Sequence, residues 1–389
     1  MTYQLNRAVF EPARFLADDW QRQPRVFRQA FSRFEDPITP DELAGVALEP
    51  GVDSRLIDNA DGQWKLKHGP IDDFSGVGAT HWSLLVQAVN EHFPPAQSLL
   101  RAFRFLPDWR IDDLMVSYST PGGGVGAHLD QYDVFIIQGQ GERRWQIGLP
   151  GTYETITPHP EIKQIAGFEP VIDVVLAAGD MIYIPAGFPH AGESISECLN
   201  YSVGFRAPSQ AELVSALADH ALENDALTKR YQDPTPLGTE QAHSVSWHLT
   251  AEHLQQFREL IRAGIADDAL LDQVIAKHLS YNPRPPLLVW PSDALTDTTV
   301  QRYVERSPVL QRAVGLRMIT CDIGGCLVGL VQGQEYELDG PSSELFEILL
   351  NTELEISTAV IAPMLKQPSA RSLMRNLLNE GFWFVPDEA

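Results

Sequence analysis

Three side chains in two short segments have the types and spacing of a metal site. A glycine-rich segment, 121–127, leads into His128 and Asp130, and a second histidine, His190, follows a segment at 179–187, about sixty residues further along. Two imidazoles and one carboxylate form the facial triad that holds Fe(II) by three ligands and leaves its other positions open. Alternate residues of a strand point to one face, so His128 and Asp130 on a strand would face the same ion. We therefore expect His128, Asp130 and His190 to be metal ligands and catalytic residues.

The turns beside these residues strengthen this interpretation. A His-x-Asp pair alone is expected on the order of once by chance in so long and acidic a chain. Here glycines precede His128, and Gly179 and Asp180 indicate a turn before an apolar strand at 181–184. Either histidine alone could be a core or loop residue. That simpler reading explains neither the spacing nor the flanking turns.

Several segments around the three residues resemble one protein family. The similarity lies in the runs 128–139, 143–145, 179–190 and 200–206. They resemble the JmjC-type 2-oxoglutarate oxygenases, and more closely the bacterial ribosomal oxygenases that hydroxylate an arginine in a large-subunit ribosomal protein. The resemblance implies a mainly β core, a cupin-like double-stranded β-helix. It also implies a dioxygenase that uses Fe(II) and the cosubstrate 2-oxoglutarate and gives succinate and carbon dioxide.

Binding 2-oxoglutarate also requires a fixed cation for its distal carboxylate, and the planar fork of arginine suits that role. Arg143 and Arg144 are adjacent, strand alternation sends only one of them inward, and the pattern does not say which. In the resembling enzymes the position two before the tryptophan binds the cosubstrate, which selects Arg143, with Ser119 and Asn200 as hydrogen-bonding neighbours. Four further residues near the motif are expected to frame the substrate side chain: Tyr118, Gln131, Tyr132 and Asp133.

The elements that must position these residues are mostly short strands separated by turns. Strand-like patterns occur at 114–119, 134–137, 144–147, 174–176, 181–184 and 199–205. They predict a β-rich catalytic core at roughly 95–207. Upstream, Thr39 to Glu42 has the form of a capping box that opens a helix through Ala47, so we expect an oxygenase domain at 1–207 with an N-terminal buttress.

After Pro208 the apolar period changes to that of helices. Three amphipathic helices are predicted, one opened by a capping box at Ser209, one around 254–264 and one around 271–279. The resemblance implies that this helical domain, 208–281, mediates dimerisation, although its helices could instead pack on the barrel of their own chain. Beyond a stiff linker at 282–286, the residues to 389 are expected to form a small α+β domain, winged-helix-like in the family.

Composition constrains the partners. The 389 residues carry a formal net charge of −23, which disfavours reading of nucleic acids and favours a basic polypeptide such as a ribosomal protein. It is equally compatible with solubility alone. The three cysteines form no Cys-x-x-Cys pair, and no segment has the length and apolarity of a membrane span. We expect a cytoplasmic protein and, in view of the helical domain, a homodimer.

Other functions remain open on the sequence. Within the JmjC type, the enzyme could hydroxylate histidine or demethylate lysine. A cupin enzyme that does not use 2-oxoglutarate usually offers two histidines at the first motif, where this chain has His128 and Asp130. A non-catalytic scaffold would be expected to have lost at least one of the three ligands, and all are present.

Overall fold

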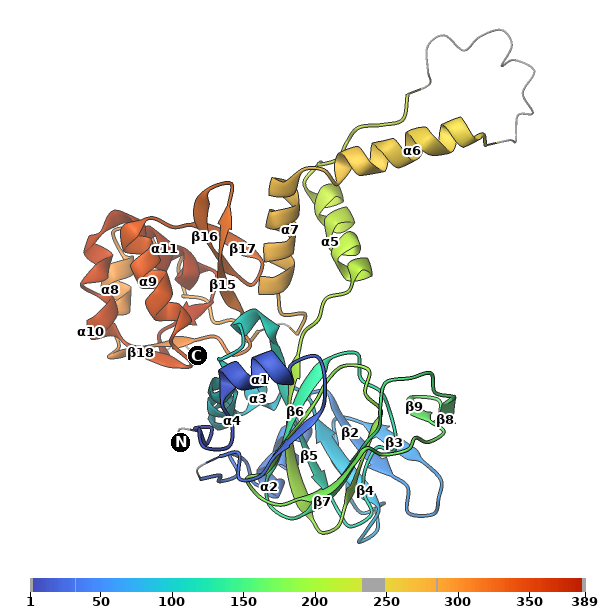
Figure 1. The fold of residues 1–389 in the computed structure, drawn as a ribbon. Coiled ribbons are helices and arrows are strands. Elements are labelled where there is room, and N and C mark those ends of the chain that lie inside the picture. Colours follow the sequence, from blue (N-terminus) through green and yellow to red (C-terminus); the bar gives the residue numbers. More distant parts are fainter. Residues whose placement is uncertain (1–2, 32, 233–248, 285, 387–389) are drawn as a thin grey trace.

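Two β-sheets form the part of the protein that contains the predicted metal ligands (Figure 1). The computed structural model describes residues 3–31, 33–232, 249–284 and 286–386. The larger sheet has the strand order β1-β11-β6-β13-β5-β4-β2-β3 and the smaller one β10-β7-β12. Their bounds are β1 (Arg25–Phe27), β2 (Ser54–Asp58), β3 (Lys65–His68), β4 (Trp82–Val86), β5 (Ile111–Ser119), β6 (Asp133–Gln138), β7 (Arg143–Ile147), β10 (Ile172–Leu176), β11 (Met181–Ile184), β12 (His190–Ser194) and β13 (Cys198–Phe205). The strands predicted within the core are therefore confirmed.

The larger sheet begins well before the predicted core boundary at residue 95. Strands β1 to β4 all lie upstream of it, and β4 pairs directly with β5. These strands are short and some carry almost no apolar alternation. Strand β3, for example, is Lys-Leu-Lys-His and largely exposed. Because periodicity signals only buried faces, the pattern of β3 does not predict a strand.

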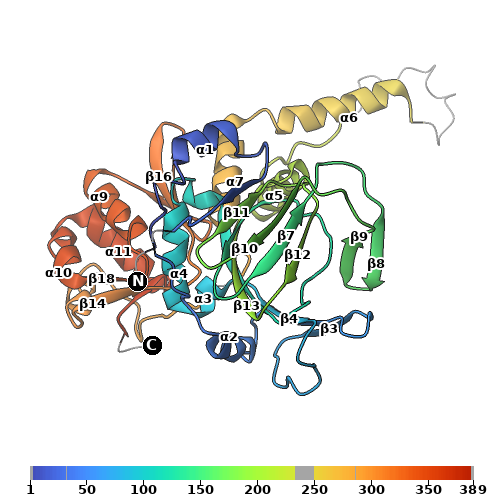
Figure 2. The same ribbon diagram turned by 60° about the horizontal axis from the view of Figure 1, so that its bottom comes forward.

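Strand β6 is buried over its whole length because both faces of the larger sheet are covered. Val134 and Ile136 face the smaller sheet, where they pack with Trp145. Phe135 points the other way into an aromatic cluster, with its ring 5.2 Å from Phe15. The helices beside that cluster are α1 (Pro12–Asp18), α2 (Pro40–Ala47), α3 (Val89–His92) and α4 (Pro94–Leu100), followed by the 3-10 turns η1 (Arg101–Phe103) and η2 (Asp108–Arg110) (Figure 2).

The capping box predicted upstream of the core is confirmed. The Thr39 side chain accepts from the Glu42 backbone, while the Glu42 carboxylate accepts from Thr39 N–H. A further hairpin that the sequence did not reveal, β8 (Thr155–His159) with β9 (Ile162–Ile165), covers the loop before β6, where Ile165 N donates to Ala127 O at 2.9 Å.

Three helices follow the sheets, as predicted: α5 (Gln210–Glu223), α6 (Ala251–Gly264) and α7 (Asp268–Ser280). Part of the expected helical domain, 233–248, lies outside the described residues, as does residue 285 of the expected linker. Helix α6 extends away from the rest of the chain and has no buried residue (Figure 1). For α6, packing on the barrel of its own chain was the wrong alternative.

The C-terminal residues form an α+β unit around their own apolar core (Figure 1). Its strands make two three-stranded sheets, β18-β14-β19 and β15-β16-β17. The elements are α8 (Val300–Val304), β14 (Val309–Arg312), β15 (Met318–Ile323), β16 (Cys326–Val331), β17 (Gln334–Glu337), α9 (Gly340–Leu350), β18 (Glu355–Ser357), α10 (Thr358–Ile361), η4 (Met364–Lys366), α11 (Pro368–Asn379) and β19 (Trp383–Phe384). Within the described ranges, no helix has the length and apolarity to cross a membrane.

Candidate metal and cosubstrate site

The two histidines are joined through their backbones. His128 N donates to His190 O, and His190 N donates to His128 O, both at 3.0 Å. His190 is the first residue of β12, whereas His128 makes only this isolated bridge and Asp130 lies in the loop between β5 and β6. The expectation that His128 and Asp130 lie on one regular strand is therefore wrong. A single bridge and the bond from Gly187 N to Asp130 O, 2.8 Å long, hold this loop in place instead.

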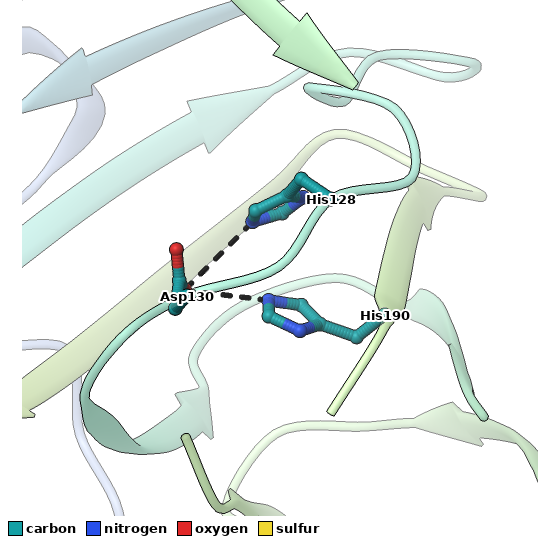
Figure 3. Close-up of side chains that lie close together, drawn as sticks. All are labelled: His128, Asp130 and His190. Carbon is teal, nitrogen blue, oxygen red and sulfur yellow. Dashed lines mark ion pairs between the residues drawn. The ribbon is translucent and has the colours of Figure 1, made fainter. Parts of the chain in front are cut away.

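The three side chains converge on one point (Figure 3). The Asp130 Oδ2 atom lies 3.5 Å from His190 Nε2 and 3.8 Å from His128 Nε2. The two imidazole centroids are 4.2 Å apart. One potential ligand atom from each residue lies within 4.8 Å of the others. The sequence prediction that these three residues come together is correct in space.

Backbone carbonyls fix which imidazole nitrogen faces the centre. His128 Nδ1 lies 3.0 Å from Gly126 O, and His190 Nδ1 lies 2.9 Å from Phe188 O. Since a carbonyl only accepts, each Nδ1 carries the proton and donates it, which leaves the Nε2 lone pair for a metal. The donor set of two neutral imidazoles and one carboxylate fits Fe(II).

The protonation states agree with this role. Burial, together with the neighbouring His190, lowers the pKa of His128 to about 4. For Asp130, burial raises the pKa, but its electrostatic interactions with His190 and His128 outweigh burial and hold the pKa below its ordinary value. Near neutral pH, His128 is therefore neutral and Asp130 ionised, the states in which these groups bind metals.

Deeper in the same cavity lies a buried cation. Arg143 is 4% exposed and lines a cavity of about 140 Å³ together with the three ligands. Its guanidinium donates to three neutral acceptors, Ser119 Oγ at 3.3 Å, Asn200 Oδ1 at 3.1 Å and Gly192 O at 3.2 Å. Among the described residues its Nε has no hydrogen-bond partner, and no carboxylate forms an ion pair with it. Burying a charge in this way is costly unless an anion joins it.

Arg144 points the other way. It lies on the exposed side of β7 and forms an ion pair with Asp173, also largely exposed. The choice of Arg143 over Arg144 as the inward residue agrees with this orientation. Ser119 and Asn200 both lie beside the Arg143 guanidinium, and Asn200 is oriented by donating through Nδ2 to Gln138 Oε1 at 2.7 Å.

The outer end of the cavity is acidic. Asp113 and Met115 project into it from β5, on the same face as Ser119, and Tyr132 lines it from the loop after Asp130. Asp113 is 3% exposed and accepts from Gln87 Nε2 at 2.7 Å and Ala88 N at 2.9 Å, both at Oδ2. Burial, followed by the charge of Asp112, raises its pKa to about 6.

Of the four expected substrate-framing residues, only Tyr132 lines this cavity. Tyr118 lies on the opposite face of β5 and packs on Trp82, because alternation separates it from Ser119 and Ser117. Asp133 is buried in a hydrogen bond with Tyr183, and Gln131 faces solvent. These three were wrong.

Sequence reasoning missed Asp113 and Trp145. Asp113 continues the alternation Ser119, Ser117, Met115 backwards along β5, and Trp145 follows Arg143 by two on β7, so strand alternation could have identified both. The Trp145 indole lies 5.1 Å beneath the Arg143 guanidinium, and its Nε1 has no partner among the described residues.

Comparison with known proteins identifies the family. Residues 98–213 match the JmjC domain. The chain is 40% identical to the ribosomal protein uL16 3-hydroxylase of Escherichia coli K12 over 370 residues, 95% of this chain and 96% of that protein. It is 34% identical to a probable ribosomal oxygenase of Haemophilus influenzae, across 75% of this chain and 74% of the relative. This chain belongs to the JmjC-type ribosomal oxygenases.

Solved structures agree along almost the whole length. An X-ray structure of E. coli YcfD has a TM-score of 0.87 and 38% identity and covers 99% of this chain and 100% of that one. A structure of YcfD, a ribosomal oxygenase, in complex with cobalt and 2-oxoglutarate has a TM-score of 0.83 and 38% identity, with 98% and 99% covered. Membership of this family makes the chain a 2-oxoglutarate-dependent dioxygenase, with Fe(II) and 2-oxoglutarate as its cofactors and a cupin-like core.

Proposed function

We propose that this oxygenase hydroxylates an arginine side chain of the ribosomal protein uL16. In this proposal His128, Asp130 and His190 hold Fe(II). Arg143 binds the distal carboxylate of 2-oxoglutarate, with Ser119 and Asn200 beside it. The relative whose name specifies uL16 as its substrate matches this chain over nearly its full length.

One observation supports a cationic substrate side chain such as arginine: the cavity has a buried cation at one end and a buried carboxylate at the other. Ser119 and Asp113 are six positions apart on one strand, which corresponds to roughly 20 Å at the usual rise per residue. The metal ligands line the same cavity. We therefore expect that a cationic side chain whose charged end reaches Asp113 has its carbon atoms inside the cavity that the metal ligands line.

The chain's own residues prepare this reaction by binding and positioning. Arg143 gains in 2-oxoglutarate the carboxylate partner that its burial requires, and its fork favours bidentate pairing. Oδ2 of Asp113 is held by Gln87 and Ala88, which leaves Oδ1 to accept from a guanidinium. Bound Fe(II) with 2-oxoglutarate and dioxygen supplies the oxidising power that places one oxygen atom on a C–H bond, while the keto acid becomes succinate and carbon dioxide.

Mass spectrometry of uL16 peptides tests this function. Overlapping peptides of uL16 are incubated with the enzyme, Fe(II) and 2-oxoglutarate, and fragmentation locates any added oxygen atom. We expect one oxygen on one arginine, none when that arginine is replaced by lysine, and none with the Asp130→Ala enzyme. Oxygen found only on histidine, or methyl groups lost from lysine, would assign the enzyme to another JmjC activity.

We also propose that the chain is organised as an oxygenase domain at 1–207, a helical dimerisation domain at 208–281 and a winged-helix-like domain at 282–389. The support for dimerisation is the apolar face of α6, where Leu254, Phe257 and Ile261 recur at helical spacing and are 42%, 40% and 65% exposed. A helix of this length with no buried residue gains its stability from packing, and a second copy of the chain offers the same face.

A further inference from the structure

Two adjacent carboxylates at the start of β5 point to different parts of the molecule. Asp113 projects into the catalytic cavity and is buried. Asp112 lines the catalytic cavity too, and it also lines a second cavity of about 160 Å³. This second cavity lies between the oxygenase part and the C-terminal residues around Met318. Asp112 is therefore the residue at which the two cavities meet.

Two arginines from beyond the helical segment hold Asp112. Arg317, directly before β15, donates through Nη2 to Asp112 Oδ1 at 2.7 Å and to its carbonyl at 3.0 Å. The Arg317 side chain is only 12% exposed. Arg284 also contacts Asp112, since its Nη2 donates to the Asp112 carbonyl oxygen at 3.3 Å. The same nitrogen forms an ion pair with Glu91 at 3.1 Å.

Amide side chains brace this contact. Asn282 donates through Nδ2 to Glu91 Oε1 and to Gly315 O, both at 2.9 Å. Gln332 Nε2 donates to Asn282 O at 2.7 Å. Arg284 N donates to Asn282 Oδ1 at 3.2 Å, and Gln332 N donates to Arg317 O at 2.9 Å. The backbones of both arginines are therefore tied to the same braced segment.

We propose that Arg317 and Arg284 are positioning residues through which the C-terminal unit keeps Asp113 charged and ready to bind the cationic side chain of the substrate. The inference rests on the proposed function, in which Asp113 receives that side chain. It gives the C-terminal unit a role in the reaction without any contact with the metal or with 2-oxoglutarate.

The charges around Asp113 explain how the two arginines act. Its pKa is raised by burial and by Asp112, and it is lowered by Arg284 and by the bonds from Gln87 and Ala88. The other ionisable groups near this end are Tyr132, whose own pKa is raised, Glu91 and Arg317. Arg317 compensates the charge of Asp112. Without Arg317, Asp113 experiences Asp112 more strongly and protonates at a higher pH.

A matched pair of variants in the full-length enzyme tests the inference. Arg317→Gln removes the charge but keeps a hydrogen-bond donor, and Arg317→Lys keeps the charge. The titration of Asp113 is followed by NMR of ¹³C-carboxyl-labelled aspartate and assigned by its absence in Asp113→Asn. We expect the Gln variant to raise the pKa of Asp113 by roughly one unit and the Lys variant to restore it.

The second measurement is the kinetics of the unmodified uL16 peptide that the enzyme is found to hydroxylate. At pH 7 a pKa raised from about 6 to about 7 roughly halves the ionised fraction of Asp113, so we expect the KM for the peptide to rise about twofold in Arg317→Gln with little change in kcat. Arg375→Ala, which removes an ion pair with Asp297 within the C-terminal unit, is the control and should leave KM unchanged.

The two measurements separate this inference from the proposed function. An Asp113 titration that is the same in wild type and Arg317→Gln overturns the inference, whatever the substrate is. So does an equal rise of KM in Arg317→Gln and Arg317→Lys, because that result indicates loss of shape instead of charge. If the titration moves but no arginine peptide is hydroxylated, the coupling is supported and the proposed substrate is wrong.

Discussion

The two ends of the catalytic cavity are built in different ways. At the inner end, Arg143 is surrounded by neutral groups of the same barrel, such as Asn200, 57 residues away. At the outer end, Asp113 is preceded by Asp112, whose partner Arg317 lies 205 residues further along in the C-terminal unit. The inner end, where we propose that 2-oxoglutarate binds, is therefore built within the barrel alone. The outer end, where we propose that the substrate side chain binds, is linked to the C-terminal unit.

The metal ligands line the same cavity as Arg143 and Asp113. Because the reaction requires the metal, loss of a ligand should have the largest effect on activity. In Asp130→Ala, removal of the only anionic ligand should abolish 2-oxoglutarate turnover and reduce bound iron, measured by succinate release and by elemental analysis. The carboxylate is not part of an apolar core, so the unfolding midpoint should change little. Full turnover by a folded Asp130→Ala enzyme would contradict the ligand assignment.

The second prediction addresses the inner end alone. Arg143→Ala should weaken the apparent affinity for 2-oxoglutarate by about 2–5 kcal/mol, the scale for a buried charge that loses its partner. Arg144→Ala is the matched control, since the neighbouring side chain pairs with Asp173 at the surface. Titration of succinate production against 2-oxoglutarate measures both. If the Arg144 variant loses affinity and the Arg143 variant does not, the assignment of the inward residue is reversed.

What the sequence reveals differs in the same way between the two ends. The strand alternation around Arg143 is local, so the sequence limited the choice to two adjacent residues, and the family resemblance selected one. The link from Arg317 to Asp112 has no local signature, because nothing in either segment indicates that they meet. Strands β2 and β3 were missed for a related reason, as their pairing is set by the sheet and not by their own pattern.

The metal site shows a further limit. His128, Asp130 and His190 were correctly brought together, but for the wrong local reason. His128 and Asp130 lie in a loop held by one backbone bridge to β12 and by the bond from Gly187 N to Asp130 O, and strand alternation does not apply to this loop. Motif spacing records which residues meet, whereas the conformation that joins them depends on a partner segment about sixty residues away.

The third prediction addresses the outer end. Asp113→Asn keeps the size of the side chain but removes its charge, so the KM for the arginine peptide should rise about tenfold to a hundredfold, equivalent to about 1.5–3 kcal/mol. Affinity for 2-oxoglutarate, bound at the inner end, should be retained. An unchanged KM would show that the substrate does not use this carboxylate.

The same carboxylate predicts a pH dependence. Its pKa is raised to about 6, and only the ionised form attracts a guanidinium, so kcat/KM should fall as the pH drops through about 6. This fall of kcat/KM near pH 6 should be absent in Asp113→Asn. If kcat/KM falls at the same pH in that variant, another group is responsible.

The smallest effect on chemistry is expected from α6, which is remote from both ends of the cavity. Ile261→Asp places a charge on its apolar face, and burying a charge between two copies is costly. Sedimentation should therefore detect a shift from dimer to monomer, while 2-oxoglutarate turnover is retained. The control is Arg262→Asp, which introduces the same aspartate at the next position. Arg262 is not on the apolar face of α6, so this variant should remain a dimer. If both variants sediment as the wild type does, the face of α6 is not the dimer contact, and the dimerisation role of the helical segment fails while the catalytic assignments are unaffected.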